Sequence, residues 1–160
     1  MNESIFWHII GKLNWSAEAD NEILAPAVEE LSSYTTDEIY LFSDILSEKL
    51  YLLDTQKHAE NIGRSSFKKG KYFSPDVFLY SRACVVANGR NYFEQILKKP
   101  ELMPKNIDFE ALIYLPQKAY AKKTGTYLFE HTPSKSYETY SNTAGWEHNY
   151  ESLYLELLTA

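Results

Sequence analysis

Residues 73–97 read FSPDVFLYSRACVVANGRNYFEQIL, and this stretch decides the fold. Ser74 is a favourable helix N-cap, because its hydroxyl can accept a hydrogen bond from a free amide of the first turn. Pro75 follows at the first helical position, where its missing N–H costs nothing. Arg82 is the one charged residue in the segment VFLYSRACVVA that comes next. A helix that is apolar nearly all round must be covered on most sides, so we expect the rest of the chain to pack around residues 75–88.

A tight corner and a second helix follow this central helix. Asn88 and Gly89 end the first helix, since both tolerate the left-handed conformation that a C-cap needs. Over residues 90–99 the apolar side chains recur at spacings of three and four, which is typical of a helix with one buried face. Pro100 ends this second helix, because proline cannot continue the hydrogen-bond ladder.

Helical periodicity also covers most of the remaining chain. A capping box at Thr35 and Glu38 begins the clearest of the other helices. The sequence therefore predicts an all-α single domain over residues 1–160, a multi-helix bundle of six to eight helices around the central apolar helix. The expected helices cover residues 2–14, 22–33, 36–53, 75–88, 90–99, 108–125 and 146–158.

Two prolines and two polar segments interrupt this pattern. Pro26 falls near the first turn of its helix, where proline is tolerated. Pro116 either kinks one helix or begins a new helix at its own position. Residues 54–69 are polar and weakly periodic, and residues 125–145 are a loop rich in Tyr, Ser and Thr. A short extended pair at residues 127–130 is a further option in that loop.

Length and cysteine content restrict the class of protein. A chain of 160 residues indicates one domain. The single cysteine, Cys84, excludes an internal disulfide and a cysteine-rich zinc site, and its place in the apolar helix predicts an inert buried thiol. The N-terminal residues lack the order of a signal peptide, and no apolar run is long enough to span a bilayer. We therefore expect a cytoplasmic protein that does not bind membranes.

The net charge of −6 conceals an uneven distribution of charge. Residues 1–62 hold 12 acidic and 3 basic residues, whereas residues 63–123 hold 12 basic and 5 acidic ones. One interpretation is internal complementarity, with acidic helices lying beside basic ones. The other is a dipolar surface that steers a charged partner. We favour the first, since charge runs are usually solvated faces.

The common catalytic motifs are absent from the sequence. It holds no His-Glu-x-x-His, no Gly-x-Ser-x-Gly and no phosphate-binding glycine loop. His58-x-Glu60 resembles a fragment of a metal site, but the Cys-x-x-Cys half of a deaminase signature is missing. The four histidines, at 8, 58, 131 and 148, lie in separate segments. We therefore expect no metal ion, no cofactor and no catalytic residues.

Arg82 has two interpretations. As a structural residue it is buried and paired with a carboxylate, and the candidates for that partner are Glu38, Asp44 and Glu94. As a functional residue it forms an anion site in a polar pocket, which would make the protein an enzyme. We favour the structural interpretation, because an arginine in an apolar helix is normally paired.

Arg64, Lys68, Lys69 and Lys71 form a basic run with aromatic residues between them. Such a composition can bind nucleic acid through phosphate contacts and base stacking. The alternative is a basic loop that faces the acidic N-terminal helices. Because the whole chain is acidic, nucleic acid is the less favoured partner.

Aromatic residues are abundant in and near the polar loop, among them Tyr127, Tyr137, Tyr140 and Trp146. Thirteen tyrosines are too many to bury, and exposed Tyr and Trp are enriched where proteins meet proteins. Ordinary packing of the loop on the core is the competing interpretation.

Several short patterns, taken together, point to a known family. They are Phe6-Trp7 with Ile10, Thr36-Asp37-Glu38-Ile39 with Phe42, Ser74-x-Asp76-x-Phe78-x-Tyr80-x-Arg82, Gly89-Arg90-x-x-Phe93-Glu94 with Pro100, and Phe109 to Gly125 with Ala119-Tyr120 and Lys123-Thr124-Gly125. In order and spacing, residues 3–125 resemble the bacterial domain-of-unknown-function family 4240. The resemblance implies a mostly helical single domain, and it brings no established activity and no catalytic residues. The chain departs from the family at residues 55–69, where members usually have an apolar helix with a tryptophan.

The leading functional hypothesis is a non-enzymatic, protein-binding bacterial protein. A concrete version is an immunity protein that neutralises a basic toxin, with the acidic N-terminal helices set against the toxin's active site. The first alternative is a nucleic-acid-associated regulator that uses residues 64–71. The second alternative is an enzyme with an anion site at Arg82. Small size, acidity and the missing catalytic motifs favour the first hypothesis.

Overall fold

The computed structural model describes residues 1–147, 155 and 157–159, and every regular element in them is helical, without a strand. The all-α prediction is therefore confirmed. No helix in this part of the chain combines the length and the apolar character needed to cross a membrane. The helices are α1 (Glu3–Ile10), α2 (Asp20–Ser32), α3 (Thr36–Leu52), α4 (Gln56–Ala59), α5 (Pro75–Ala87), α6 (Arg90–Lys98) and α7 (Leu115–Thr124), with 3₁₀ turns η1 (Pro100–Leu102), η2 (Glu110–Tyr114) and η3 (Thr143–Gly145).

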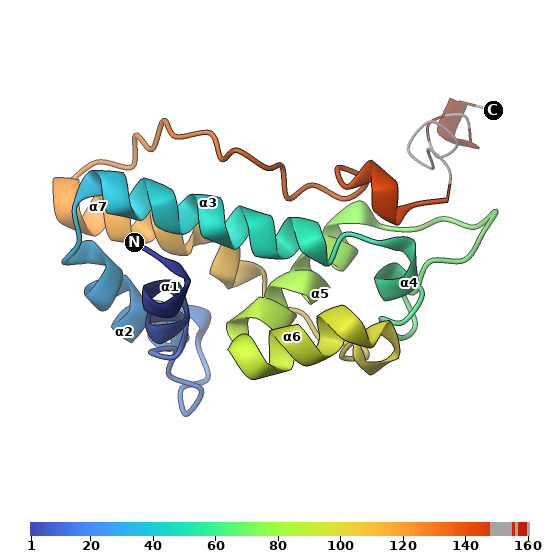
Figure 1. Ribbon diagram of the computed structural model, residues 1–160, viewed down its shortest axis with the longest axis horizontal. Coiled ribbons are helices and arrows are strands. Elements are labelled where there is room, and N and C mark those ends of the chain that lie inside the picture. The colour runs from blue at the N-terminus through green and yellow to red at the C-terminus, as the bar shows by residue number, and fades with distance from the viewer. Residues whose placement is uncertain (148–154, 156, 160) are drawn as a thin grey trace.

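The long helix α3 joins two groups of helices (Figure 1). At one end of the molecule α1 and α2 lie with α7, and α2 packs against α7. At the other end α5 and α6 lie together beside α3, with α4 beyond them. Since α3 contacts α1, α5 and α7, one hydrophobic core runs through both groups.

The covered helix that the sequence predicts is α5. Nine of its thirteen residues are buried, and Arg82 is among them. The hydroxyl of Ser74 caps its first turn by accepting a hydrogen bond from Val77 N at 3.3 Å. Gly89 follows the C-cap with a φ of +99°, a conformation that side-chain-bearing residues rarely adopt. The prediction of a central helix over residues 75–88 is confirmed.

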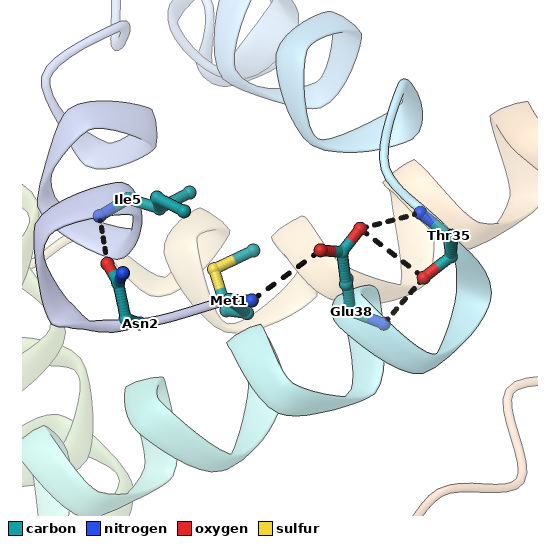
Figure 2. Close-up of polar contacts among 5 residues, drawn as sticks. All are labelled: Met1, Asn2, Ile5, Thr35 and Glu38. Atoms are coloured by element: carbon teal, nitrogen blue, oxygen red, sulfur yellow. Dashed lines mark hydrogen bonds and ion pairs between the residues drawn. The ribbon is translucent and has the colours of Figure 1, made fainter.

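The helix α3 begins at the capping box that the sequence predicts (Figure 2). Thr35 Oγ1 accepts a hydrogen bond from Glu38 N at 3.2 Å, and the Glu38 carboxylate accepts one from Thr35 N at 3.1 Å. The terminal nitrogen of Met1 lies 3.5 Å from Glu38 Oε1, and Asn2 caps α1 beside it. The hydrogen bond from Thr35 N lowers the pKa of Glu38, and the charge at Met1 adds to this effect. These contacts tie the start of α1 to the start of α3.

The start of α2 differs from the prediction. The helix begins at Asp20, so Pro26 lies in its interior and not near its first turn. Negative charge stabilises a helix N-terminus, and the first turn contains both Asp20 and Glu22, which favours the earlier start. Pro26 is exposed, while the buried residues of α2, such as Leu24, hold the helix on the core.

Pro116 begins a new helix, which was one of the two alternatives. The turn η2 ends at Tyr114 and α7 starts at Leu115, so Pro116 lies in the first turn of α7. Proline is tolerated there because the amides of a first turn have no intrahelical partner. α7 ends at Gly125, which has a φ of +78° and donates its N–H to Ala121 O.

Residues 126–147, here called the strap, return along α3 toward α4 (Figure 1). The extended pair considered for residues 127–130 is not formed, since no strand occurs there. The strap is held by side chains of the core, which are described below. The predicted polar loop is therefore an ordered path across α3.

The expected C-terminal helix is only partly tested by the structure. Trp146 is not helical, because its φ of −120° and ψ of 137° are those of an extended residue. Leu155 and residues 157–159 are helical. The rest of the predicted helix lies outside the described residues.

Candidate functional site

Two charged side chains of the core bind the strap. Arg82 lies on α5 and Asp54 lies just after α3, and each has 0 % of its surface exposed. Burying a charge is unfavourable unless hydrogen bonds replace the lost water. The strap supplies most of those hydrogen bonds.

The guanidinium of Arg82 donates hydrogen bonds to three oxygens. Nη1 donates to Leu50 O in α3 and to Tyr137 O in the strap, each at 2.9 Å. Nη2 donates at 2.9 Å to the hydroxyl of Thr139, which itself donates to Pro75 O at 2.7 Å. One arginine therefore joins α3, the start of α5 and the strap.

None of the carboxylates expected as partners of Arg82 binds it. Glu38 belongs to the capping box, Asp44 lies 2.8 Å from a histidine of the strap, and Glu94 pairs within α6. The prediction of a buried, structural Arg82 is right about burial and wrong about the partner. Its acceptors are two carbonyls and a hydroxyl, because those are the groups that the strap and α3 present at this depth.

Burial lowers the pKa of Arg82 to about 10, while the nearby charge of Asp54 acts in the opposite direction. The side chain therefore keeps its charge at neutral pH. The guanidinium also lies 4.6 Å from the centroid of the Phe78 ring, a cation–π contact. Because Arg82 has no exposed surface, the geometry favours a structural role over an anion site.

Asp54 accepts hydrogen bonds from three N–H groups of the strap. Oδ1 accepts from Tyr140 N at 3.2 Å and from Trp146 Nε1 at 3.1 Å, and Oδ2 accepts from Asn142 N at 3.0 Å. Tyr140 has a φ of +76°, in the left-handed region, so the strap turns sharply at this point. We did not single out Asp54 from the sequence. The available signal was an acidic residue directly after the apolar end of α3.

The far end of the strap is packed against aromatic rings and against backbone. Trp146 is 7 % exposed. Gly145 approaches the connection between α3 and α4 so closely that an added Cβ would lie 2.8 Å from Asp54 O. Any side chain at position 145 would therefore push the strap away. The rings around Trp146, with centroids 4.7 to 6.4 Å away, are Tyr140, Phe67, Phe78 and Phe73.

The aromatic residues of the loop are less exposed than an interface would need. Trp146 is buried, and Tyr137 and Tyr140 are half-buried against the core. These three residues pack on the core, which agrees with the competing interpretation of ordinary loop packing. Tyr127 is 77 % exposed and remains accessible to a partner.

The basic run is exposed and lies at the end of the molecule opposite to α2 (Figure 1). Among the described residues, Arg64, Lys68, Lys69 and Lys71 find no ion-pair partner. No ion pair of the described residues therefore supports the interpretation of a basic loop that faces the acidic N-terminal helices. Acidic residues of those helices form ion pairs with other basic residues.

Two of the ion pairs made by acidic residues of the N-terminal helices are with lysines. Glu29 on α2 lies 2.8 Å from Lys122 on α7, and Glu3 on α1 pairs with the buried Lys49 on α3. Internal charge complementarity therefore applies to these helices and not to the basic run. Five exposed carboxylates of this region form no ion pair with any described residue: Glu18, Asp20, Glu22, Asp37 and Glu48.

The described side chains considered for metal or thiol chemistry are buried in the core or lie too far apart to share a metal ion. Across residues 1–147 and the few described beyond them, no group of three or more His, Cys, Asp or Glu could hold a metal ion. The buried His58 ring contacts Thr55 Oγ1 at 2.6 Å and Ile96 O at 3.0 Å. His148 lies outside the described residues. Cys84 is buried, and desolvation raises the pKa of its thiol, as expected for an inert cysteine.

Three surface pockets lie away from Arg82. One of about 440 Å³ runs between α2 and α7, and Tyr127 is part of its lining. A second of about 500 Å³ lies between α4 and the end of the strap. The third, of about 240 Å³, contains Arg64 and Ser81, and the Ser81 hydroxyl has no hydrogen-bond partner among the described residues.

Comparison with known proteins gives one match. The family described as a protein of unknown function, DUF4240, matches residues 1–122, from α1 to the last turn of α7. No curated protein and no solved structure matches the chain. The matched range coincides closely with the resemblance seen in the sequence, and the strap lies beyond it. Because the match covers more than half of the sequence, this chain belongs to the DUF4240 family.

Proposed function

We propose that this protein is a non-enzymatic, protein-binding module, and that it binds at the end of the molecule where α2 lies against α7. We call this region the acidic end, after the carboxylates in the first turn of α2. The observation that carries the proposal is an apolar groove with a charged rim. The groove of about 440 Å³ has Ala25, Val28 and Ala121 in its lining, with Glu29 and Lys122 beside them. An apolar centre with a polar rim is the usual anatomy of a protein interface.

Exposed side chains next to this groove support the proposal. Tyr127 lines the groove with 77 % of its surface exposed, and tyrosine is enriched among the residues that dominate binding energy. Asp20 and Glu22, in the first turn of α2, are exposed and form no ion pair with the residues that the structure describes. Their negative field would speed the approach of a basic partner.

The concrete version of this proposal is an immunity protein that neutralises a toxin with a basic active site. The carboxylates of α2 would meet the toxin's cations, and Tyr127 would supply apolar contact. The burial of Arg82 supports a binding role over the enzyme alternative, because its charge is not accessible to a substrate.

Co-expression with the products of the adjacent genes tests the proposal. We expect one of them to co-purify with the tagged chain at low salt and to bind more weakly as salt rises, since salt screens exposed charges. The double variant Asp20→Asn, Glu22→Gln should weaken this complex at least about tenfold.

A matched control removes two charges elsewhere. The double variant Glu101→Gln, Glu147→Gln makes the same change in net charge at exposed positions away from α2. It should bind like the unmodified chain. Equal weakening by both double variants would mean that net charge, and not the acidic end, governs binding. Failure of every adjacent gene product to bind at any salt concentration would contradict the proposal.

A nucleic-acid-associated role is the second candidate, because the four basic residues of the run are exposed. Lys68, Lys69 and Lys71 surround a tight turn, and Tyr72 beside them is 69 % exposed. The variant Lys68→Glu, Lys69→Glu should abolish any mobility shift of DNA or RNA, and the unmodified chain should lose binding steeply with salt. The absence of a shift at low salt would remove this candidate.

A further inference from the structure

The strap covers a surface that residues of the family segment form, here called the strap groove. Without the strap, Arg82 would keep Leu50 O as its one remaining acceptor, and Asp54 would lose the three N–H donors described above. Without the strap these charges would be left to water, so any segment that covers them again must supply hydrogen bonds in place of those that the strap makes. The residues that form this strap groove lie within residues 1–122, while the segment that fills it lies outside that range. The residues that form the strap groove are Leu50, Asp54, Phe67, Phe73, Pro75, Phe78 and Arg82.

Polar contacts in the strap groove are made both to the main chain and to side chains of the bound segment. Arg82 binds a carbonyl at position 137, and Asp54 binds amides at positions 140 and 142. Side chains are recognised at three positions. The hydroxyl of Thr139 lies between Arg82 and Pro75 O, the side-chain amide of Asn142 donates to Tyr51 O, and the indole of Trp146 donates to Asp54. Domains that bind extended peptides combine main-chain hydrogen bonds with side-chain pockets in the same way.

The anchored part of the strap is joined to α7 through an exposed stretch. Thr132, Ser134, Lys135 and Ser136 are all exposed. The anchored residues 137–146 are therefore a ligand on a tether. A short tether raises the effective concentration of such a ligand to the millimolar range without adding contacts.

We propose that the strap groove is a peptide-binding site, which this chain occupies with its own residues 137–146 and which accepts an extended segment of a protein partner. The recognised segment has a hydroxyl residue that reaches Arg82 and Pro75 O, followed seven residues later by a tryptophan that reaches Asp54. The partner's segment displaces the strap, because the two use the same groups. This site is separate from the acidic end and does not rest on the function proposed there.

The first experiment weakens the strap in the intact chain. Gly145→Ala places a Cβ 2.8 Å from Asp54 O and should loosen the strap, while Thr143→Ala changes an exposed neighbour. A fluorescein-labelled peptide with the sequence of residues 135–147 should bind the Gly145→Ala chain at least about tenfold more tightly than the Thr143→Ala chain, since its tethered competitor is weaker. Equal binding to the two variants would overturn the proposal.

The second experiment measures specificity in a cut chain. A protease site inserted between Ser134 and Lys135 of the full chain allows the tether to be cut after folding, with the C-terminal fragment still bound. The labelled peptide should then exchange with that fragment. Peptides with Thr139→Val or Trp146→Ala should compete roughly tenfold and a hundredfold less well, and one with Thr143→Ala, at an exposed position, should compete like the unmodified peptide. No exchange, or equal competition by all four peptides, would contradict the proposal.

The proposal for the acidic end and the proposal for the strap groove can be contradicted independently of each other. The variant Asp20→Asn, Glu22→Gln should leave the binding of the labelled peptide unchanged, because α2 does not line the strap groove. If that variant reduced peptide binding as much as it reduced the partner complex, the peptide would be bound at the acidic end and the strap groove would be excluded.

Discussion

His58 is a buried histidine whose protonated nitrogen follows from its partners. Nε2 lies 3.0 Å from Ile96 O, which can only accept, so Nε2 carries the proton in the neutral ring. Nδ1 then accepts a hydrogen bond from the hydroxyl of Thr55 at 2.6 Å. Burial lowers the pKa of His58, and the charge of Arg82 lowers it further, against the opposing effect of the bond to Ile96 O.

This arrangement predicts a loss of stability at acidic pH that depends on His58. Above the unfolded-state pKa of 6.5 the histidine is neutral in both states, so it makes no pH-dependent contribution. Below pH 6.5 the unfolded chain binds a proton that the folded chain does not, and the free energy of unfolding falls. The variant His58→Gln cannot titrate, and it retains an amide that can donate to Ile96 O. Denaturation of both proteins between pH 7.5 and 5 should give curves that diverge below pH 6.5; parallel curves would contradict the assignment.

At the scale of single residues, local signals predict burial better than they predict partners. Arg82 could be recognised as buried because it is the one charge in an apolar helix. Its acceptors, Tyr137 O and the Thr139 hydroxyl, could not be recognised, since they lie 55 and 57 positions along the chain. The role of Asp54 could not be recognised either, because an acidic residue after a helix is ordinarily solvated.

At the scale of helices, the capping box of α3 is a local device with a measurable effect. The Thr35 hydroxyl accepts from Glu38 N at 3.2 Å, and Thr35→Ala removes this acceptor. The free energy of unfolding should fall by about 1 kcal/mol, as for other N-cap threonines. The control Thr36→Ala, one position into the helix, should change it much less. Urea denaturation of the three proteins measures the difference, and equal effects of the two variants would mean that the cap is not contributing.

The strap is the element whose attachment depends most on one side chain. Asp54→Asn removes the charge that accepts from Tyr140 N, Asn142 N and the Trp146 indole. We expect a loss of roughly 2 kcal/mol, the scale of hydrogen bonds to a charged group. Trypsin should then cut after Lys135, an exposed strap residue, much faster than in the unmodified chain.

The same digest contains its own reference. Cleavage after Lys12, an exposed residue that follows α1, should keep its rate in the Asp54→Asn variant, because that segment belongs neither to the strap nor to the residues that hold it. The exposed variant Asp37→Asn should change neither site. If cleavage at both lysines accelerated together in Asp54→Asn, the residue would stabilise the whole fold and would have no special role at the strap.

Elements set by local patterns were predicted closely, and elements set by distant contacts were not. α3, α5 and α6 end within one residue of prediction, because caps, prolines and glycines mark their ends. Pro26 was misplaced because the start of α2 is defined by charges and not by an N-cap side chain. The course of the strap depends on hydrogen bonds to α3 and α5. Its polar composition therefore indicates a loop but does not predict where that loop runs across the molecule.

At the scale of the whole molecule, charge complementarity is partial. Glu29 on α2 pairs with Lys122 on α7, as expected for an acidic helix beside a basic one, whereas Glu3 pairs with Lys49 inside the acidic segment itself. The basic run lies at the opposite end and has no ion-pair partner among the described residues (Figure 1). The surface is therefore dipolar as well, so the two interpretations of the sequence describe different parts of one molecule.

The central claim is that α5 is a covered helix and that its Arg82 belongs to the core that holds the strap. Native-state hydrogen exchange tests this claim most directly. We predict that the amides of α5 from Phe78 to Ala87 exchange only through global unfolding. The amides of Tyr140 and Asn142, which donate to Asp54, should be protected, while those of residues 132–136 exchange freely. Fast exchange in α5, or protection at 140 and 142 no greater than at 132–136, would contradict the account.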